Sequence, residues 1–196
     1  MRKIILIILI CFHGIYAQEA PFNCDYNAYL FQYNDIYAID LASGNSYAVA
    51  TDITEGIINA AAYNPADGYI WGSLSYPPKS IVRIGKDFST LIFYVDELPT
   101  SNRYIGDINA EGIYYLKGGG TAYYTINLNP ESDNYGQHIA TLNLPKSINI
   151  HDWAFNAVDN MLYTVEKNTN YLYRINIATG TMTNLGEVPR ITFGNC

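Results

Sequence analysis

Residues 151–176 read HDWAFNAVDNMLYTVEKNTNYLYRIN. The stretch contains three short runs rich in aromatic and aliphatic residues, separated by two polar segments. Such runs favour β-strands, and Asp159-Asn160 supplies residue types that tolerate a positive φ in a tight turn. The stretch therefore predicts three consecutive antiparallel strands.

The last run of this stretch has counterparts upstream. A phrase of aromatic or aliphatic residues that closes on a polar residue or glycine occurs at residues 37–40, 82–85, 124–127 and 173–176. A second phrase precedes it, because residues 63–71 match residues 155–163 and residues 107–115 form a shortened copy. Repeats of about 40–50 residues that each hold four short strands are typical of a β-propeller.

The repeats define the expected strands of each unit. The first strands are expected at residues 58–63 and 150–155, and the second at 69–72 and 162–165. The third are expected at 80–84 and 171–175, and the fourth at 46–50 and 182–185. No window has the apolar spacing of an amphipathic helix. The prediction is an all-β, propeller-like fold of about four four-stranded repeats, and the alternative is a β-sandwich.

The first 17 residues have the features of a signal peptide. Arg2 and Lys3 precede an apolar run at residues 4–12, and small residues follow at 14–17. Cleavage would leave residues 18–196 as a single exported domain, with no further run long enough to insert into a membrane. The chain carries a net charge of −7, and cleavage would remove two basic residues. This balance argues against a nucleic-acid partner, which requires a basic face.

Two cysteines, Cys24 and Cys196, lie at opposite ends of the expected domain. In an exported protein such a pair is a candidate disulfide. Residues 28–32 and 36–40 resemble second and third strands with no first strand before them, whereas residues 190–196 resemble a first strand with nothing after it. The two ends are therefore expected to complete one blade. The alternative is a longer propeller that is cut off after its fourth repeat.

Several phrases resemble a family of secreted propeller-type repeat domains found in bacterial surface and adhesin-like proteins, whose function is not known. They are residues 152–156 (DWAFN), 171–176 (YLYRIN) and 191–194 (ITFG), together with the opening 22–24 (FNC). The resemblance covers nearly all of the expected mature chain and implies a fold rather than an activity. In that family the Thr-Phe-Gly phrase usually opens a further repeat, whereas here the sequence stops two residues later.

Candidate site residues come from aligning the first strands, whose ends meet around a propeller's axis. The alignment brings together Asn59, Asp107, His151 and Asp152, with the two aspartates as a converging acidic pair. Carboxylates in that position could hold a cation or a polar ligand. The competing interpretation is that each carboxylate accepts hydrogen bonds from backbone N–H groups at a strand end.

The favoured function is a secreted, non-catalytic binding or adhesion module that recognises an extracellular protein or glycan. Tyrosine is abundant, with 19 residues, and loop positions are expected to expose the rings of Tyr33, Tyr76, Tyr104 and Tyr135. Such rings beside Asn and Asp suit sugar stacking. One alternative is a metal-assisted hydrolase or lyase that uses Asp107, His151 and Asp152, and another is a structural spacer. The sequence contains no motif that predicts a cofactor.

Overall fold

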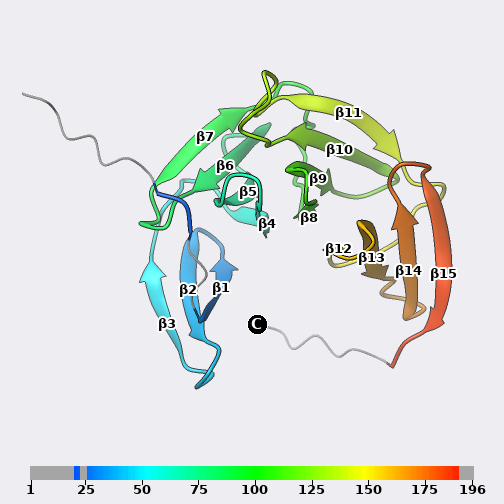
Figure 1. Ribbon diagram of the computed structural model, residues 1–196, viewed down its shortest axis with the longest axis horizontal. Coiled ribbons are helices and arrows are strands. Elements are labelled where there is room, and N and C mark those ends of the chain that lie inside the picture. The colour runs from blue at the N-terminus through cyan, green and yellow to red at the C-terminus, as the bar shows by residue number, and fades with distance from the viewer. Residues whose placement is uncertain (1–19, 23–25, 190–196) are drawn as a thin grey trace, which may run out of the picture.

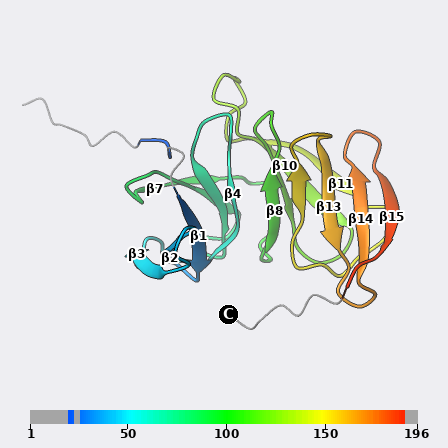
Figure 2. The same ribbon diagram turned by 60° about the horizontal axis from the view of Figure 1, so that its bottom comes forward.

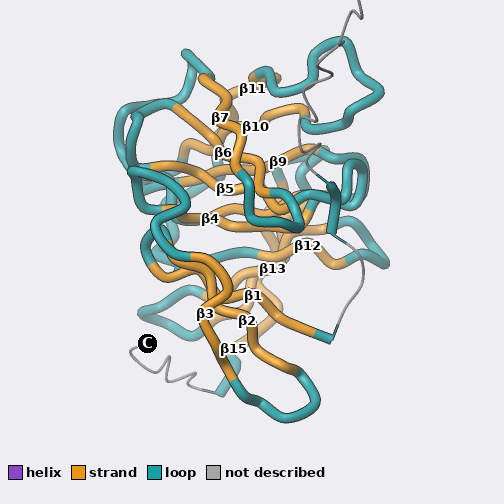
Figure 3. Tube along the Cα trace, turned by 90° about the vertical axis from the view of Figure 1, so that its left-hand side faces the viewer, coloured by secondary structure: helices purple, strands orange, loops and turns teal. Residues whose placement is uncertain are grey.

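The computed structural model describes residues 20–22 and 26–189. Those residues form strands, turns and loops with no helix (Figure 3). Among them, accordingly, no helix is long and apolar enough to cross a membrane. The expected all-β fold is confirmed.

Four antiparallel sheets follow one another around a ring, which makes the fold a four-blade β-propeller (Figure 1). The first blade contains β1 (Asn27–Gln32), β2 (Asp35–Asp40) and β3 (Ser46–Ala50). The second contains β4 (Ile58–Tyr63), β5 (Ile70–Leu74), β6 (Ser80–Ile84) and β7 (Thr90–Tyr94). The third contains β8 (Ile105–Ile108), β9 (Ile113–Lys117), β10 (Ala122–Asn127) and β11 (His138–Asn143). The fourth contains β12 (Ala154–Asn156), β13 (Met161–Val165), β14 (Tyr171–Asn176) and β15 (Thr181–Glu187).

The expected strand positions are largely confirmed, and β3, β4 and β6 have the predicted bounds. The first blade has three strands among the described residues, as its sequence predicted. The completing strand was expected at residues 190–196 and the disulfide between Cys24 and Cys196. Both lie outside the described residues and stay predictions, as does the signal peptide at residues 1–17.

The first strand of the fourth blade starts later than predicted. Residues 150–155 were expected to be extended, but β12 begins at Ala154 and Ile150 forms only an isolated bridge with Glu166. The reason lies in Asp152, whose carboxylate accepts hydrogen bonds from the backbone N–H groups of Trp153 and Gly106. That local bonding replaces ladder pairing just before the strand.

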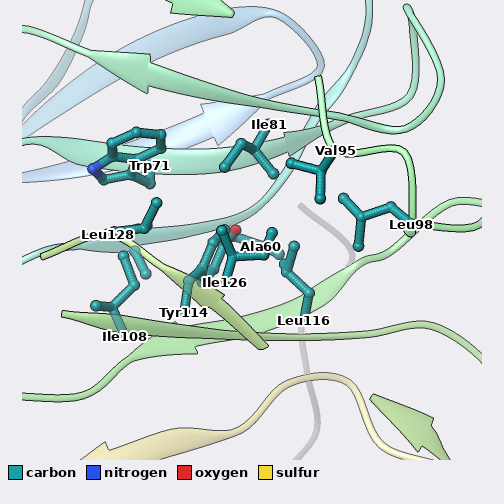
Figure 4. Close-up of a cluster of buried hydrophobic side chains, with 11 residues drawn as sticks. Ala60, Trp71, Ile81, Val95, Leu98, Ile108, Tyr114, Leu116, Ile126 and Leu128 are labelled. Atoms are coloured by element: carbon teal, nitrogen blue, oxygen red, sulfur yellow. The ribbon is translucent and has the colours of Figure 1, made fainter. Parts of the chain in front are cut away.

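The core is divided into layers between adjacent blades. One apolar cluster joins the first and second blades, a second joins the second and third, and a third joins the third and fourth. Figure 4 shows the middle cluster, in which Trp71 of β5 and Tyr114 of β9 are both fully buried. Each sheet is therefore covered on the faces that its neighbours contact, which explains why alternation along the strands is weak in the sequence.

The turns predicted at Asp67-Gly68 and Asp159-Asn160 are both present, and their aspartates bind side chains of the strands that follow. Gly68 and Asn160 have φ values of 76° and 53°. Asp67 accepts a hydrogen bond from the indole N–H of Trp71 at 2.9 Å, and Asp159 accepts one from the hydroxyl of Tyr163 at 2.7 Å. The two repeats thus use an aspartate and an aromatic residue four positions later in the same way.

Chain direction gives the ring two distinct faces. Because the strands alternate in direction, the loops between second and third strands emerge on the same face as the loops that lead from one blade to the next. We call this the interblade face. Loops between first and second strands, such as residues 64–69, emerge on the opposite face. β1, β4 and β8 lie side by side (Figure 2). The first residues of β4 and β8 lie at the interblade face.

Candidate functional site

The predicted acidic pair is brought together by neighbouring blades. Asp107 lies on β8 and Asp152 lies two residues before β12, and these two strands are in contact. The Asp107 Oδ2 accepts a hydrogen bond from the N–H of Phe155 at 2.7 Å, and its Oδ1 accepts one from Ile108 at 2.8 Å. The Asp152 Oδ1 accepts hydrogen bonds from Gly106 at 3.1 Å and Trp153 at 2.9 Å.

These bonds decide between the two interpretations of the pair for Asp107. Both of its oxygens accept backbone N–H groups, so it acts as a link between two blades. Asp152 differs, because its Oδ2 has no partner among the described residues. The structure therefore leaves one carboxylate oxygen of the pair available to a ligand.

Poor hydration raises the pKa of both aspartates. Burial raises the pKa of Asp107, although the N–H groups of Phe155 and Ile108 oppose the shift. Burial raises the pKa of Asp152 to about 6, with the charge of Asp107 as a smaller contribution. The Asp152 side chain is nevertheless exposed, because a carboxyl on the wall of a hollow can touch water and still be incompletely solvated.

A hollow adjoins this end of the fourth blade. It measures about 260 Å³ and is lined by His151, Asp152, Trp153, Ala154, Tyr163 and Val165. Burial lowers the pKa of His151, with a further contribution from Lys167, which favours the neutral imidazole. The indole N–H of Trp153 is buried without a hydrogen-bond partner in the described chain.

The remaining candidate, Asn59, lies on β4 and is partly buried. It shares the interblade end of the first strands with Asp107 but does not line the hollow beside His151. Across residues 20–22 and 26–189, no three His, Cys, Asp or Glu side chains converge as a metal site would require. The alignment of first strands thus placed Asp107 and Asp152 on neighbouring blades that are in contact, and ligand binding by the four candidate residues stays a prediction.

A second feature of the interblade face is a group of exposed side chains on its loops. Tyr33 is 73% exposed in the β1–β2 loop, Tyr76 is 56% exposed in the β5–β6 loop, and Tyr104 is 44% exposed just before β8. Ile57, just before β4, is 39% exposed. We call these four residues the tyrosine strip.

Backbone contacts fix the strip as one continuous surface. The carbonyl of Tyr33 accepts a hydrogen bond from Ile58, and the carbonyl of Ile57 accepts one from Ser75, the residue before Tyr76. Gly56 has no room for a side chain, because an added Cβ would lie 2.2 Å from the carbonyl oxygen of Tyr76. The loop before β4 therefore packs against both the β1–β2 loop and the β5–β6 loop.

Arg103 attaches the third tyrosine to the same surface. Its buried guanidinium donates hydrogen bonds to the Oγ of Ser73 at 2.9 Å and to the carbonyl of Leu74 at 3.2 Å. It also donates to the carbonyl of Pro99. Burial lowers the pKa of Arg103, but these acceptors replace water around the cation. Arg103 thus fixes the loop that presents Tyr104 beside the strand end that presents Tyr76.

Three of the four tyrosines expected on the surface are exposed, and the expectation for Tyr135 is wrong. Its ring is partly buried, 5.8 Å from the ring of Trp71 and 5.9 Å from that of Phe93. Its hydroxyl donates to Asp67 at 3.1 Å. Because Trp71 and Phe93 belong to the previous blade, loop position alone did not predict this packing.

Residues 35–195 match a family described as a repeat of unknown function, DUF6923. The match covers most of the sequence. The chain belongs to this family. The family description contains no statement about activity, location or partner, so membership supports the repeat architecture only. No curated protein matches the sequence.

Solved structures similar to this DUF6923 chain confirm the fold and differ in what they do. Alignment with a streptogramin B lyase gives a TM-score of 0.55 at 17% identity, and covers 83% of this chain and 51% of that one. A chain of a nidogen/laminin complex gives 0.56 at 11% identity, with coverages of 82% and 61%. An auxiliary nutrient binding protein from Bacteroides thetaiotaomicron gives 0.53 at 13% identity, with coverages of 81% and 37%.

The DUF6923 chain therefore spans between about a third and three fifths of the length of these three structures. At such low identity the similarity concerns the fold alone. Because the three structures are those of a lyase, a nutrient binding protein and a chain of a protein complex, the fold does not decide between binding and catalysis.

Proposed function

We propose that the mature chain is a secreted, non-catalytic binding module that recognises an extracellular protein or glycan through its interblade face. The observation that carries the proposal is the tyrosine strip, in which three tyrosines on separate loops are exposed on one surface. Folding alone would favour polar residues at such loop tips. Exposed aromatic groups on a rigid scaffold instead supply contact area at low entropic cost.

The bonding of the acidic pair also supports binding over catalysis. Three of the four carboxylate oxygens of Asp107 and Asp152 accept backbone N–H groups. A carboxylate committed in this way holds blades together and is poorly placed to exchange protons with a substrate. The surface is also acidic on balance, in keeping with the net charge of −7.

The proposal is tested by presenting residues 18–196 to a glycan array and, separately, to extracellular proteins in a pull-down. The matched control carries Tyr33→Asn, Tyr76→Ala and Tyr104→Ala together. We expect a selective ligand that is retained by the parent chain and lost by the triple variant. Blank results in both assays, or retention that is equal in both proteins, would contradict the proposal and favour the structural spacer.

One observation favours a second candidate, a metal-assisted hydrolase or lyase. Asp152, whose Oδ2 accepts no hydrogen bond within the described residues, lines the same hollow as His151. Elemental analysis of the purified chain, combined with melting curves with and without EDTA, tests this candidate. Bound Ca, Mg or Zn whose removal lowers the melting temperature in the parent chain but not in Asp152→Asn would support it.

A further inference from the structure

We propose that the exposed edge of β7, the outermost strand of the second blade, binds an extended segment of another protein as a fifth strand of that blade. The segment is uncharged over its paired residues and carries a lysine or arginine at its N-terminal end. The edge lies on the outer rim of the ring (Figure 1), apart from the tyrosine strip, so the inference goes beyond the proposed function.

β7 differs from the other outermost strands in having no bulge. β3, β11 and β15 each contain one extra residue relative to the strand that they pair with, at Val49, Ile139 and Leu185. A bulge bends an edge strand and interrupts the row of groups to which a further strand would bond. The five residues of β7 instead pair with β6 in an unbroken register. Among the described blades, therefore, only the second presents a regular outer edge.

The open backbone groups of this edge follow from the pairing. The N–H of Val95 and the carbonyl of Ser89, which flank β7, both bond toward the β6 side. Alternate residues of an antiparallel strand bond to opposite sides, so the N–H and C=O groups of Thr90, Ile92 and Tyr94 point outward. These backbone groups have no hydrogen-bond partner within the described part of the chain. An extended peptide is the ligand that supplies N–H and C=O groups at the matching spacing.

The exposed side chains of β7 are apolar. Leu91 is 43% exposed, Ile92 is 37% exposed and Tyr94 is 70% exposed, and the strand contains no charged residue. Edge strands are commonly protected from further pairing by a charged residue or a proline, and β7 has neither. β-Branched and aromatic side chains of a partner strand would pack against these three residues. We therefore expect the paired residues of the segment to be uncharged and rich in β-branched types.

A hollow at the C-terminal end of β7 indicates the charge of the segment. It measures about 250 Å³ and lies between the residues that follow β7 and the start of β11, with Asp96, Glu97 and His138 among its lining residues. Asp96 and Glu97 are both exposed. Lys79, whose ammonium donates to the carbonyl of Asp96 at 2.6 Å, offsets one of the two negative charges. A cationic side chain is therefore favoured at this end, where an antiparallel segment has its N-terminus.

Charge argues against a second copy of the chain as the occupant of the edge. Antiparallel pairing of two β7 edges would be centred on Ile92, the middle residue of the three whose backbone groups point outward. It would bring Asp87 of one copy near Glu97 of the other at both ends of the pair, and both residues are exposed. Like charges that face each other across two strands repel. A separate, basic segment avoids this repulsion.

The test titrates a fluorescently labelled peptide, Lys-Thr-Val-Ile-Val-Thr with blocked ends, with residues 18–196 and follows the anisotropy. A derivative that is N-methylated at its four central residues keeps the side chains and the charge but cannot donate along either edge. Ile92→Pro removes an outward N–H of β7 without breaking the pairing with β6. Thr141→Pro is the matched control, because Thr141 has the equivalent outward position on β11, where Leu144 bonds toward β10.

The expected result assigns binding to the backbone of β7. N-methylation and Ile92→Pro each weaken peptide binding by about tenfold, whereas Thr141→Pro leaves the affinity within about twofold. Glutamate in place of the peptide's lysine weakens binding by about threefold, and this difference disappears when Asp96→Asn and Glu97→Gln are combined. The triple tyrosine variant binds the peptide as the parent chain does.

Three results would overturn the inference. The first is the absence of peptide binding up to about 1 mM. The second is binding that N-methylation leaves unchanged, a comparison that stays valid even where Ile92→Pro does not fold. The third is a dimer, measured by light scattering, that Ile92→Pro dissociates, because the occupant of the edge would then be a second copy. Each of these results leaves the proposed function in place, since that function is tested through the tyrosine strip.

Discussion

Asp107 and Asp152 link two blades by a reciprocal exchange of hydrogen bonds. Asp107 on β8 accepts the N–H of Phe155 on β12, and Asp152, just before β12, accepts the N–H of Gly106 on β8. Each carboxylate thus satisfies a backbone donor of the other blade. We expect Asp107→Ala to lower the free energy of unfolding by about 1–3 kcal/mol, because it leaves backbone N–H groups of β8 and β12 unpaired. Urea denaturation measures the change, and an unchanged midpoint would show that water replaces the carboxylate.

The raised pKa of Asp152 predicts a pH dependence with a definite sign. A carboxyl with a folded pKa of about 6, against an ordinary value of 3.8, keeps its proton in the folded chain after the unfolded chain has lost it. Its ionisation therefore destabilises the fold as pH rises from about 4 to 6, and the effect levels off above that range. Asp152→Asn removes this contribution.

The difference in unfolding free energy between Asp152→Asn and the parent chain isolates Asp152 from the other carboxyls, whose pKa values also change on folding. Burial raises the pKa of Asp67, as it does for Asp152, whereas backbone hydrogen bonds lower the pKa of Asp40. We expect the variant to gain stability relative to the parent between pH 4 and 6. Denaturation at intervals of half a pH unit measures this difference, and a constant difference across the range would contradict the assignment.

The buried hydroxyl of Tyr114 gives a prediction at another blade contact. It donates to the carbonyl of Ala60, which a bulge in β4 turns toward the third blade. Ala60 has a φ of 55° and Tyr114 is fully buried. Tyr114→Phe leaves that carbonyl without a partner and should lower stability by about 1–3 kcal/mol. Leu116→Met on the same strand is a matched control that keeps volume and loses no hydrogen bond. Equal effects of the two substitutions would refute a special role for the hydroxyl.

The two turn aspartates should differ in importance although the repeats align them. Asp67 accepts hydrogen bonds from the side chains of Trp71 and of Tyr135 in the next blade. Among the side chains of the described residues, Asp159 accepts a hydrogen bond from Tyr163 alone, which belongs to its own blade. We expect Asp67→Ala to lower the melting temperature clearly more than Asp159→Ala. Differential scanning calorimetry of both variants checks the order, and the reverse order would contradict it.

Much of the fold was predictable because each blade repeats a local pattern. Turn residues such as Asp67-Gly68 and Asp159-Asn160 fix hairpins through neighbours in sequence, and the recurring strands fix the number of units. The bulge at Ala60 was not predictable, since alanine gives no signal for a positive φ and the hydroxyl that donates to the Ala60 carbonyl comes from another blade.

The candidate site was predictable in location more than in detail. Aligning the repeats placed Asp107 and Asp152 together, but their acceptance of backbone N–H groups depends on the spacing of β8 and β12. Exposure was predicted correctly for Tyr33, which is exposed at the tip of the β1–β2 loop. It failed for Tyr135, which the aromatic surface of the previous blade covers. Arg103 was missed because a lone arginine in a loop suggests solvent rather than burial.

Recognition on the interblade face is the central claim, and hydrogen–deuterium exchange tests it most directly. The exchange of residues 18–196 is measured with and without the ligand captured by the array or pull-down. The account predicts protection in residues 33–34, 54–58, 75–79 and 101–104, with no change in residues 64–69 or 157–160 of the opposite face. Protection confined to the opposite face, or the absence of any captured ligand, would contradict it.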